Sequence, residues 1–453
     1  MSKNGLTACL ALVTSLSAMA QDSIPASPKV WTLEDCIGYA IENNITIRQS
    51  RLNTESAAAD IMAAKGNMFP SLSFSASQTV FNRPFQDNTT TISGTEILTS
   101  NSSTSYTGSY GLNAQWTLFN GGRTRKTLKQ NEIAYEQSEL DSQTQTNSIL
   151  EAIASAYVQI LYADESVKVN RNTLEVSIAQ CERGKELLDA GSISAPDYAQ
   201  LQAQVSNDRY QLVVSENSLA DYKLQLKQLL ELEPGEEMEI PIDSLSDMAA
   251  AAALPDKMEV YESALVSRPE IKAAELAVES SEMGVRLSRS GYYPSVSLSA
   301  GIGTNHTSGT DFTFAEQLKN GWNNSAGLTV SVPIFNNRQT KSSVQKAKLQ
   351  YTYSQLELTA AKKDLYKTIE GIWLDAYSAQ QQFTAAQDNV RSTEISYSLV
   401  NEQFGLGMKN TVELLTEKNN YLSAQQQLLQ AKYMAILNTK LLQFYAEGTI
   451  TME

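Results

Sequence analysis

The side chains that most often carry out catalysis or bind metals are scarce in this chain. Its 453 residues contain one histidine, His306, and three cysteines, Cys9, Cys36 and Cys181. A nucleophilic triad needs a base beside its nucleophile, and a multi-histidine metal site needs a second imidazole. Phosphate-binding loops are absent from the sequence, and acidic residues are spread along helical stretches as on solvated surfaces. The sequence therefore predicts a protein that is not an enzyme and uses no cofactor or metal.

Two acidic side chains do stand in a pattern with a physical meaning. Asp197 follows Ser194 by three residues, and Glu413 follows Asn410 at the same spacing. Ser or Asn at a helix N-cap, with an acid at the third helical position, is the signature of a capping box. We therefore expect both acids to cap helices. An additional role in gating or ion selectivity is compatible with capping, and the residues alone leave it open.

The N-terminal residues 1–20 have the pattern of a secretory signal peptide. Lys3 precedes an apolar run from Leu6 to Leu16, and Ala18-Met19-Ala20 provides the small residues that signal peptidase recognises. The letters before Cys9 resemble a lipobox, but the apolar run follows that cysteine instead of preceding it. We therefore expect secretion and cleavage, without lipidation.

The chain is acidic, and its charge limits the partners it can have. The net charge of −15 becomes one unit more negative when Lys3 leaves with the signal. This argues against nucleic acid or an anionic surface as the principal partner, whereas an acidic lumen would favour cations. No later run of about 18 apolar residues is present, so a membrane role must come from strands. Cys36 and Cys181 are expected to be buried thiols in helices.

The sequence contains an internal repeat. FPSLS at 69–73 matches YPSVS at 293–297, and Gly191 matches Gly407, at offsets of 224 and 216 residues. Each half reads as a helix, a strand after a proline, a polar loop, a second strand and a long helical stretch broken near the glycine, which we interpret as a turn glycine. The predicted boundaries are 21–230 for the first repeat, 231–256 for a linker, 257–447 for the second repeat and 448–453 for a tail.

Each repeat contains two segments with the alternation of a half-buried strand. The four predicted strands are 71–81, 106–119, 295–304 and 322–335. Apolar residues alternate with small uncharged ones, as in a sheet with one apolar face and one face toward a water-filled lumen. Tyr106, Tyr110, Trp116 and Trp322 fit the aromatic girdles of a transmembrane barrel, and each strand has about the 9 to 11 residues needed to cross. Half of a soluble sandwich is the alternative.

Four strands cannot close a barrel on their own. An open edge in hydrocarbon leaves backbone groups unpaired, so the sequence predicts an oligomer. A dimer would give eight strands and a trimer twelve, and the residues do not choose between them. The polar connections 82–105 and 304–321 are expected to be extracellular loops that either control access or serve only solubility.

The rest of the chain predicts unusually long helices, in the stretches 123–230 and 338–447. The proline-free stretch from Arg123 to about Ala190 would span about 100 Å at 1.5 Å per residue, as one helix or as two stacked helices. Heptad steps such as Leu415, Leu422 and Leu429 predict coiled-coil packing. A narrow apolar seam among Gln, Ser, Asn and Ala suits the staves of a hollow cylinder. A coiled-coil stalk explains the heptads equally well, but not the strands.

Three segments carry a family resemblance. FGLGMKNTVELLTEKNNYLSAQQQLLQAK at 404–432 resembles the C-terminal signature of TolC-type outer membrane efflux proteins. AGSISAPDYAQLQAQVSNDRYQL at 190–212 is similar to its first-half counterpart, and WTLEDCIGYAIENN at 31–44 resembles the start of the family. The family's Asn-Pro pair appears here as Asn44-Ile45, partly answered by Arg268-Pro269. The resemblance covers the whole chain after the signal.

The resemblance implies both a fold and a function. The implied fold class is a mixed membrane α/β barrel, a homotrimer with four strands per chain in a twelve-stranded outer-membrane barrel continued by a periplasmic helical barrel. The implied function is the passive exit duct of a tripartite efflux or type I secretion system, in the outer-membrane lipid of a Gram-negative bacterium. Its partners would be a periplasmic adaptor and an inner-membrane RND or ABC transporter. A trimeric stalk or adhesin and a passive porin are the alternatives.

The resemblance also points to a gate at the two hairpin turns of the long helices. Relatives carry acids there that line a cation-attracting constriction, and Asp197 and Glu413 hold the matching positions. Lys409 takes the place of a basic residue that helps to lock the closed state. Phe404 stands where some relatives carry a tyrosine, which puts a hydroxyl-mediated lock in doubt. Glu417 lies one position beyond the place of a second acid.

Overall fold

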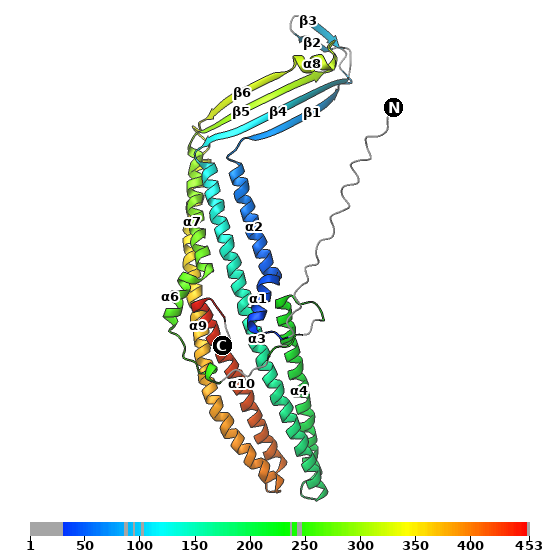
Figure 1. Cartoon of the computed structure of the whole chain (residues 1–453), viewed down its shortest axis with the longest axis vertical. Helices are drawn as coiled ribbons and strands as arrows, with labels where there is room; N and C mark the ends of the chain where they lie inside the picture. Colours follow the sequence, from blue (N-terminus) through cyan, green and yellow to red (C-terminus); the bar gives the residue numbers. More distant parts are fainter. Residues whose placement is uncertain are drawn as a thin grey trace.

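The computed structural model describes most of the chain. The described residues are 30–85, 89–93, 96–100, 104–235, 238–241 and 247–450. The predicted signal peptide at 1–20 and the last three residues of the predicted tail lie outside them. The described part is elongated, with a sheet at one end and long helices leading away from it (Figure 1).

One four-stranded antiparallel sheet forms the upper end of the molecule in Figure 1. In spatial order its strands are β1 (Ser71–Asn82), β4 (Thr104–Asn120), β5 (Ser295–Thr307) and β6 (Asn323–Ser331). Phe74 pairs with Leu112, and Leu112 pairs with Ile302, so apolar side chains share one face. Ser73 pairs with Asn113 on the other face. The outer edges of β1 and β6 have no partner strand within the described part of the chain.

The strand ends differ from the predicted ranges mainly in the second half. β5 continues to Thr307, three residues beyond the predicted end, whereas β6 stops at Ser331 instead of 335. Pro333 lacks a backbone N–H and cannot donate to a sheet ladder, which explains the early end. Ile334 beyond it is 96 % exposed.

Two elements lie in segments predicted to be loops. β2 (Thr89–Ser93) and β3 (Glu96–Ser100) form a separate hairpin between β1 and β4. The short helix α8 (Phe314–Asn320) lies between β5 and β6 and begins with a capping box in which Thr313 and Glu316 bond each other's backbone. Polar composition concealed both elements from the sequence analysis.

Each half begins with two helices that lead to the sheet. The first half has α1 (Leu33–Asn43) and α2 (Ile45–Gly66), and the second half has α6 (Lys257–Ser267) and α7 (Pro269–Arg289). Asn44 caps α2 by accepting the backbone N–H groups of Thr46 and Ile47. Pro269 starts α7 at a position that needs no donor. Where the family carries Asn-Pro, this chain has Asn44-Ile45; it therefore keeps the N-cap of α2 and lacks only the proline.

Four long helices form two hairpins below the sheet. α3 (Arg123–Asp189) pairs with α4 (Ala195–Leu230), and α9 (Gln339–Gly405) pairs with α10 (Thr411–Glu447). α3 and α9 each have 67 residues in one continuous helix, about 100 Å at 1.5 Å per residue, and are not divided. Among the described helices, none is long and apolar enough to cross a membrane. These helices and the sheet confirm the predicted fold class.

The main apolar core lies midway along the helices, where α1, α6 and the ends of α4 and α10 meet α3. Trp31, Ile153 and Phe444 are among its fully buried side chains. The short helix α5 (Asp247–Ala250) and the turn Ser290–Tyr292 complete the described elements. This core joins the middle of α3 and α9 to the ends of α4 and α10, away from the sheet and the hairpin tips.

Candidate functional site

The two tips of the hairpins have the same backbone geometry. Gly191 and Gly407 adopt φ of 74° and 72°, in the left-handed region that favours glycine. The N–H of Gly191 donates to the carbonyl of Leu188, and the N–H of Gly407 donates to that of Phe404, both at 2.9 Å. At both tips, the backbone N–H of the residue after the glycine also donates, to the carbonyl five residues before it. Both are Schellman endings, as expected of turn glycines.

A capping box follows each tip turn. The Oγ of Ser194 donates to the carboxylate of Asp197 at 2.5 Å, and the backbone N–H of Asp197 donates to that Oγ at 3.3 Å. At the second tip, the N–H of Glu413 donates to the side-chain oxygen of Asn410 at 2.9 Å, and the N–H of Asn410 donates to the Glu413 carboxylate at 3.2 Å. The N–H of Ser194 donates to Asp197 in the same way, also at 3.2 Å. The structure thus places both acids as caps of α4 and α10.

Lys409 and Glu413 form an ion pair at the second tip. The Nζ of Lys409 donates to Glu413 Oε1 at 2.7 Å. This bond, together with the N–H of Asn410, holds the pKa of the Glu413 carboxyl below its usual value. The pair leaves Glu413 half-buried and in contact with water. A solvated carboxylate at the tip can attract cations while remaining ionised at low pH.

The other two gate candidates lie within the hairpins. Phe404 is 2 % exposed and packs in a small core with Leu187, Leu201 and Leu414, which joins the two hairpins near their tips. Glu417 accepts a hydrogen bond from the Oγ of Ser396 at 2.8 Å, between α10 and α9. Phe404 therefore serves as an apolar contact between hairpins.

A buried charged cluster that the sequence analysis missed ties the hairpins together above the tips. The Nζ of Lys418 on α10 lies 2.6 Å from the Oδ2 of Asp208 on α4, and Ser177 on α3 hydrogen-bonds to both. The side chains of Lys418 and Asp208 are 4 % and 2 % exposed. Burial lowers the pKa of the Lys418 ammonium, and Asp208 partly offsets this. The helices meet here through charge instead of apolar packing.

Further polar contacts extend this connection toward the tip. Gln180 on α3 donates to the hydroxyl of Tyr397 and the amide oxygen of Asn401 on α9, both at 2.8 Å. Arg183 donates to the carbonyl of Gly405 at 3.1 Å. A signal was available for Asp208, because it lies seven residues after the buried Leu201, where the heptad would place an apolar side chain.

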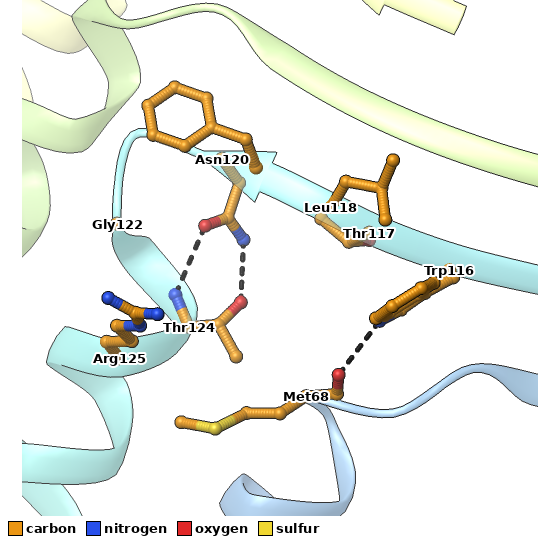
Figure 2. Close-up of a pocket in the computed structure, with 9 residues that line it drawn as sticks. Met68, Trp116, Thr117, Leu118, Asn120, Gly122, Thr124 and Arg125 are labelled. Atoms are coloured by element: carbon orange, nitrogen blue, oxygen red, sulfur yellow. Dashed lines mark hydrogen bonds between the residues drawn. The ribbon is translucent and has the colours of Figure 1, made fainter. Parts of the chain in front are cut away.

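A pocket marks the joint between the sheet and α3 (Figure 2). The indole N–H of Trp116 donates to the carbonyl of Met68 at 2.8 Å, which fastens β4 to the end of α2. The side chain of Asn120 accepts from the N–H of Thr124 and donates to its hydroxyl, so the strand passes directly into the helix. We interpret the pocket as the joint at which these hydrogen bonds connect the sheet to the helices.

The described residues include few groups that could react or bind a metal. No cluster of three or more His, Cys, Asp or Glu side chains among them is arranged to hold a metal ion. Cys36 is buried, and burial raises the pKa of its thiol to about 12, so it stays protonated and unreactive. Cys181 lies in α3 as predicted but is only half-buried, which corrects the prediction that both cysteines are buried thiols.

Comparison with known proteins identifies the family. The family model described as outer membrane efflux protein matches residues 36–231 and 260–443. The chain is 23 % identical over 409 residues to outer membrane efflux protein BepC of Brucella suis, covering 90 % of this chain and 83 % of BepC. It is 22 % identical over 404 residues to toxin and drug export protein A of Aggregatibacter actinomycetemcomitans, covering 89 % and 83 %.

Solved structures share the fold. A structure of CusC has a TM-score of 0.76 at 19 % identity and covers 91 % of each chain. The outer membrane protein VceC of Vibrio cholerae has a TM-score of 0.74 at 17 % identity and covers 93 % of this chain and 97 % of VceC. The matched ranges span both halves of the molecule, including the sheet and both hairpins. This chain belongs to the outer membrane efflux protein family and is an outer-membrane exit duct that extends into the periplasm.

Proposed function

We propose that the protein is a passive homotrimeric duct that conducts its cargo from an inner-membrane pump across the periplasm and outer membrane. A periplasmic adaptor would couple it to an RND or ABC transporter, which would supply the energy. The chain itself would carry out no reaction. Curated relatives support this assembly, since one is described as a toxin and drug export protein.

The observation that carries the proposal is the sheet with two different faces and two free edges. Its apolar face suits lipid, and its face of Ser, Asn and Gly suits a water-filled lumen. The edges of β1 and β6 need partners in a membrane, and neighbouring copies can provide them. Three copies would give twelve strands, wide enough for an aqueous channel, whereas two would give a barrel filled by side chains.

The proposed gate lies at the tips of the hairpins. Asp197 and Glu413 would present a ring of carboxylates to the lumen, and Lys409 would hold Glu413 in place. Glu417 and Phe404 would maintain the spacing of the helices behind that ring through their contacts between helices. Capping and selectivity are then two roles of the same acids.

A porin or a stalk would differ from this duct in specific ways. A stalk would not conduct, and a simple porin has no need of helices that continue about 100 Å below its barrel. The two hairpins and the sheet occur in one chain, connected by a joint at Trp116 and Asn120. A continuous duct accounts for all three features.

Single-channel recording in planar bilayers, with oligomer mass measured alongside, tests the function and the gate separately. We expect a trimeric, weakly conducting, cation-selective channel. The double variant Asp197→Asn, Glu413→Gln keeps polar groups for capping and should reduce cation selectivity. Glu282→Gln, which alters an exposed ion pair on α7, should leave selectivity unchanged.

The outcomes distinguish the two claims. Unchanged selectivity in the double variant would reduce Asp197 and Glu413 to helix caps while the duct remains. A protein that inserts without conducting would favour the stalk, and one that neither oligomerises nor inserts would contradict the duct itself.

A further inference from the structure

The short helix α8 lies on the apolar face of the sheet, near the outer end of β5. The hydroxyl of Thr304 donates to the carbonyl of Leu318 in α8 at 2.6 Å. The ring of Phe314 in α8 meets the imidazole of His306 edge-on, with centroids 4.9 Å apart. Thr304 and His306 share the alternating face that carries Ile302. Two separate contacts therefore place α8 on the lipid side of the sheet.

The packing of His306 confirms which face this is. Its ring stacks on Tyr110 of β4, with centroids 5.9 Å apart. It also lies directly over Gly108, where an added Cβ would come within 2.2 Å of the imidazole. Gly108 and Tyr110 alternate in register with the apolar Leu112. The lumen-side residues, such as Ser109, point away from this cluster.

The height of α8 along the barrel coincides with an expected membrane boundary. Val296, opposite Phe119, lies at the periplasmic end of β5, and His306 lies ten positions further along. Ten residues rise about 34 Å along a strand, or about 26 Å along the barrel axis at a tilt of about 40°. The apolar band of such barrels is about 25 Å tall. α8 therefore sits at the outer limit of that band.

The exposed residues in and around α8 have the composition of a helix that lies at a membrane interface. Phe312, Phe314 and Trp322 around it are 53 %, 54 % and 60 % exposed. Trp322 lies just before β6 and two residues before Asn324, which pairs with Ile302. By alternation, Trp322 therefore lies on the same face of the sheet as Ile302. Exposed aromatic rings combined with the polar Glu316 and Lys319 suit the boundary between headgroups and acyl chains.

We propose that α8, with Phe312 and Trp322, forms a lipid-contacting anchor that sits in the outer leaflet of the outer membrane. The connection between β5 and β6 then serves the membrane side of the barrel and leaves the channel mouth open. The occupant of this surface is outer-leaflet lipid, because the exposed rings of Phe312, Phe314 and Trp322 lie beyond Ile302 on the side of the sheet that carries the apolar residues. This inference goes beyond the duct function and depends on neither the cargo nor the gate.

Spin-label accessibility tests the anchor in the assembled protein reconstituted into outer-membrane lipid. A nitroxide at Phe314→Cys is compared with one at Ser109→Cys, which lies at a similar height on the lumen face. Both variants carry Cys181→Ser, since Cys36 is buried. We expect the label at 314 to collide severalfold more with oxygen and severalfold less with a water-soluble nickel complex than the label at 109.

Two results would overturn the anchor. Equal access of the nickel complex to both labels would place α8 in water. A label at 314 that is shielded from both reagents and shows dipolar coupling would place α8 against a second copy of the chain. Trp322→Cys provides a second reporter if the label at 314 disturbs packing, and it should show the same preference for oxygen.

Discussion

At the scale of single residues, the buried pair of Lys418 and Asp208 is the feature with the largest energetic consequence. Removing two charges from water costs several kcal/mol each, which their mutual attraction and the bonds from Ser177 must offset. The net contribution to stability is therefore small while both charges are present. The loss of either one leaves the other buried without compensation.

The variant Lys418→Met should destabilise the protein by about 3 to 5 kcal/mol, because Asp208 remains buried and unpaired. The double variant Lys418→Met, Asp208→Leu should recover most of that loss. Lys432→Met is a matched control on the same helix, whose partner Asp247 is 64 % exposed, and should cost less than about 1 kcal/mol. Unfolding midpoints followed by circular dichroism measure all three, and equal losses in Lys418→Met and the control would contradict the argument.

The pH dependence of selectivity follows from the ion pair at the tip. Lys409 and the N–H of Asn410 depress the pKa of the Glu413 carboxyl from its ordinary value of 4.5. The pairing free energy is thus fully present above that pH and is lost only as pH falls through the lowered pKa. We expect cation selectivity due to Glu413 to persist below pH 4.5.

The variant Lys409→Met removes the main cause of the lowered Glu413 pKa. The pH at which half of the selectivity is lost should therefore move upward, toward 4.5. Reversal potentials measured in a salt gradient across a pH series give both midpoints. Identical midpoints in the two proteins would show that the ion pair is absent from the conducting state.

At the scale of elements, the sheet separates lipid from lumen by one-residue alternation, and this can be tested with neighbouring positions. Phe74 lies near the middle of the apolar band, opposite Leu112, whereas Ser73 faces the other way. Phe74→Lys should cost about 2 to 4 kcal/mol, the penalty for a lysine facing lipid at mid-depth. Ser73→Lys should insert normally and reduce cation selectivity.

The yield of inserted oligomer and the reversal potential separate the two lysine variants. If Phe74→Lys inserted as well as Ser73→Lys, the assignment of faces would be wrong. The test also bears on α8, because the helix is placed on the lipid side through the same alternation.

At the scale of the whole molecule, the fold followed from patterns that are local in sequence. Alternation in 71–81 and 106–119 predicts strands because side chains point to opposite faces, and proline-free heptad stretches predict the long helices. The capping roles of Asp197 and Glu413 were likewise within reach, since a cap involves residues three apart. Each of these features depends on neighbours along the chain.

The features that the sequence did not predict depend on contacts between segments that are distant along the chain. Lys418 and Asp208 are 210 residues apart, so the heptad position of Asp208 could indicate that it is buried but could not identify Lys418 as its partner. The position of α8 depends on its packing against Thr304 and His306, which its polar sequence does not reveal. Phe404 joins the hairpins through a small core to which all four long helices contribute.

The free edges of β1 and β6 determine how the protein must mature. Neither edge has a partner strand within the described part of the chain, and lipid offers the exposed backbone groups no water to pair with. If the barrel closes as the proposed trimer, its closure and its entry into the membrane would be coupled, and several newly secreted copies would have to meet. The rate at which mature protein appears would then depend on monomer concentration with an order above one whenever the meeting of copies is the slow step.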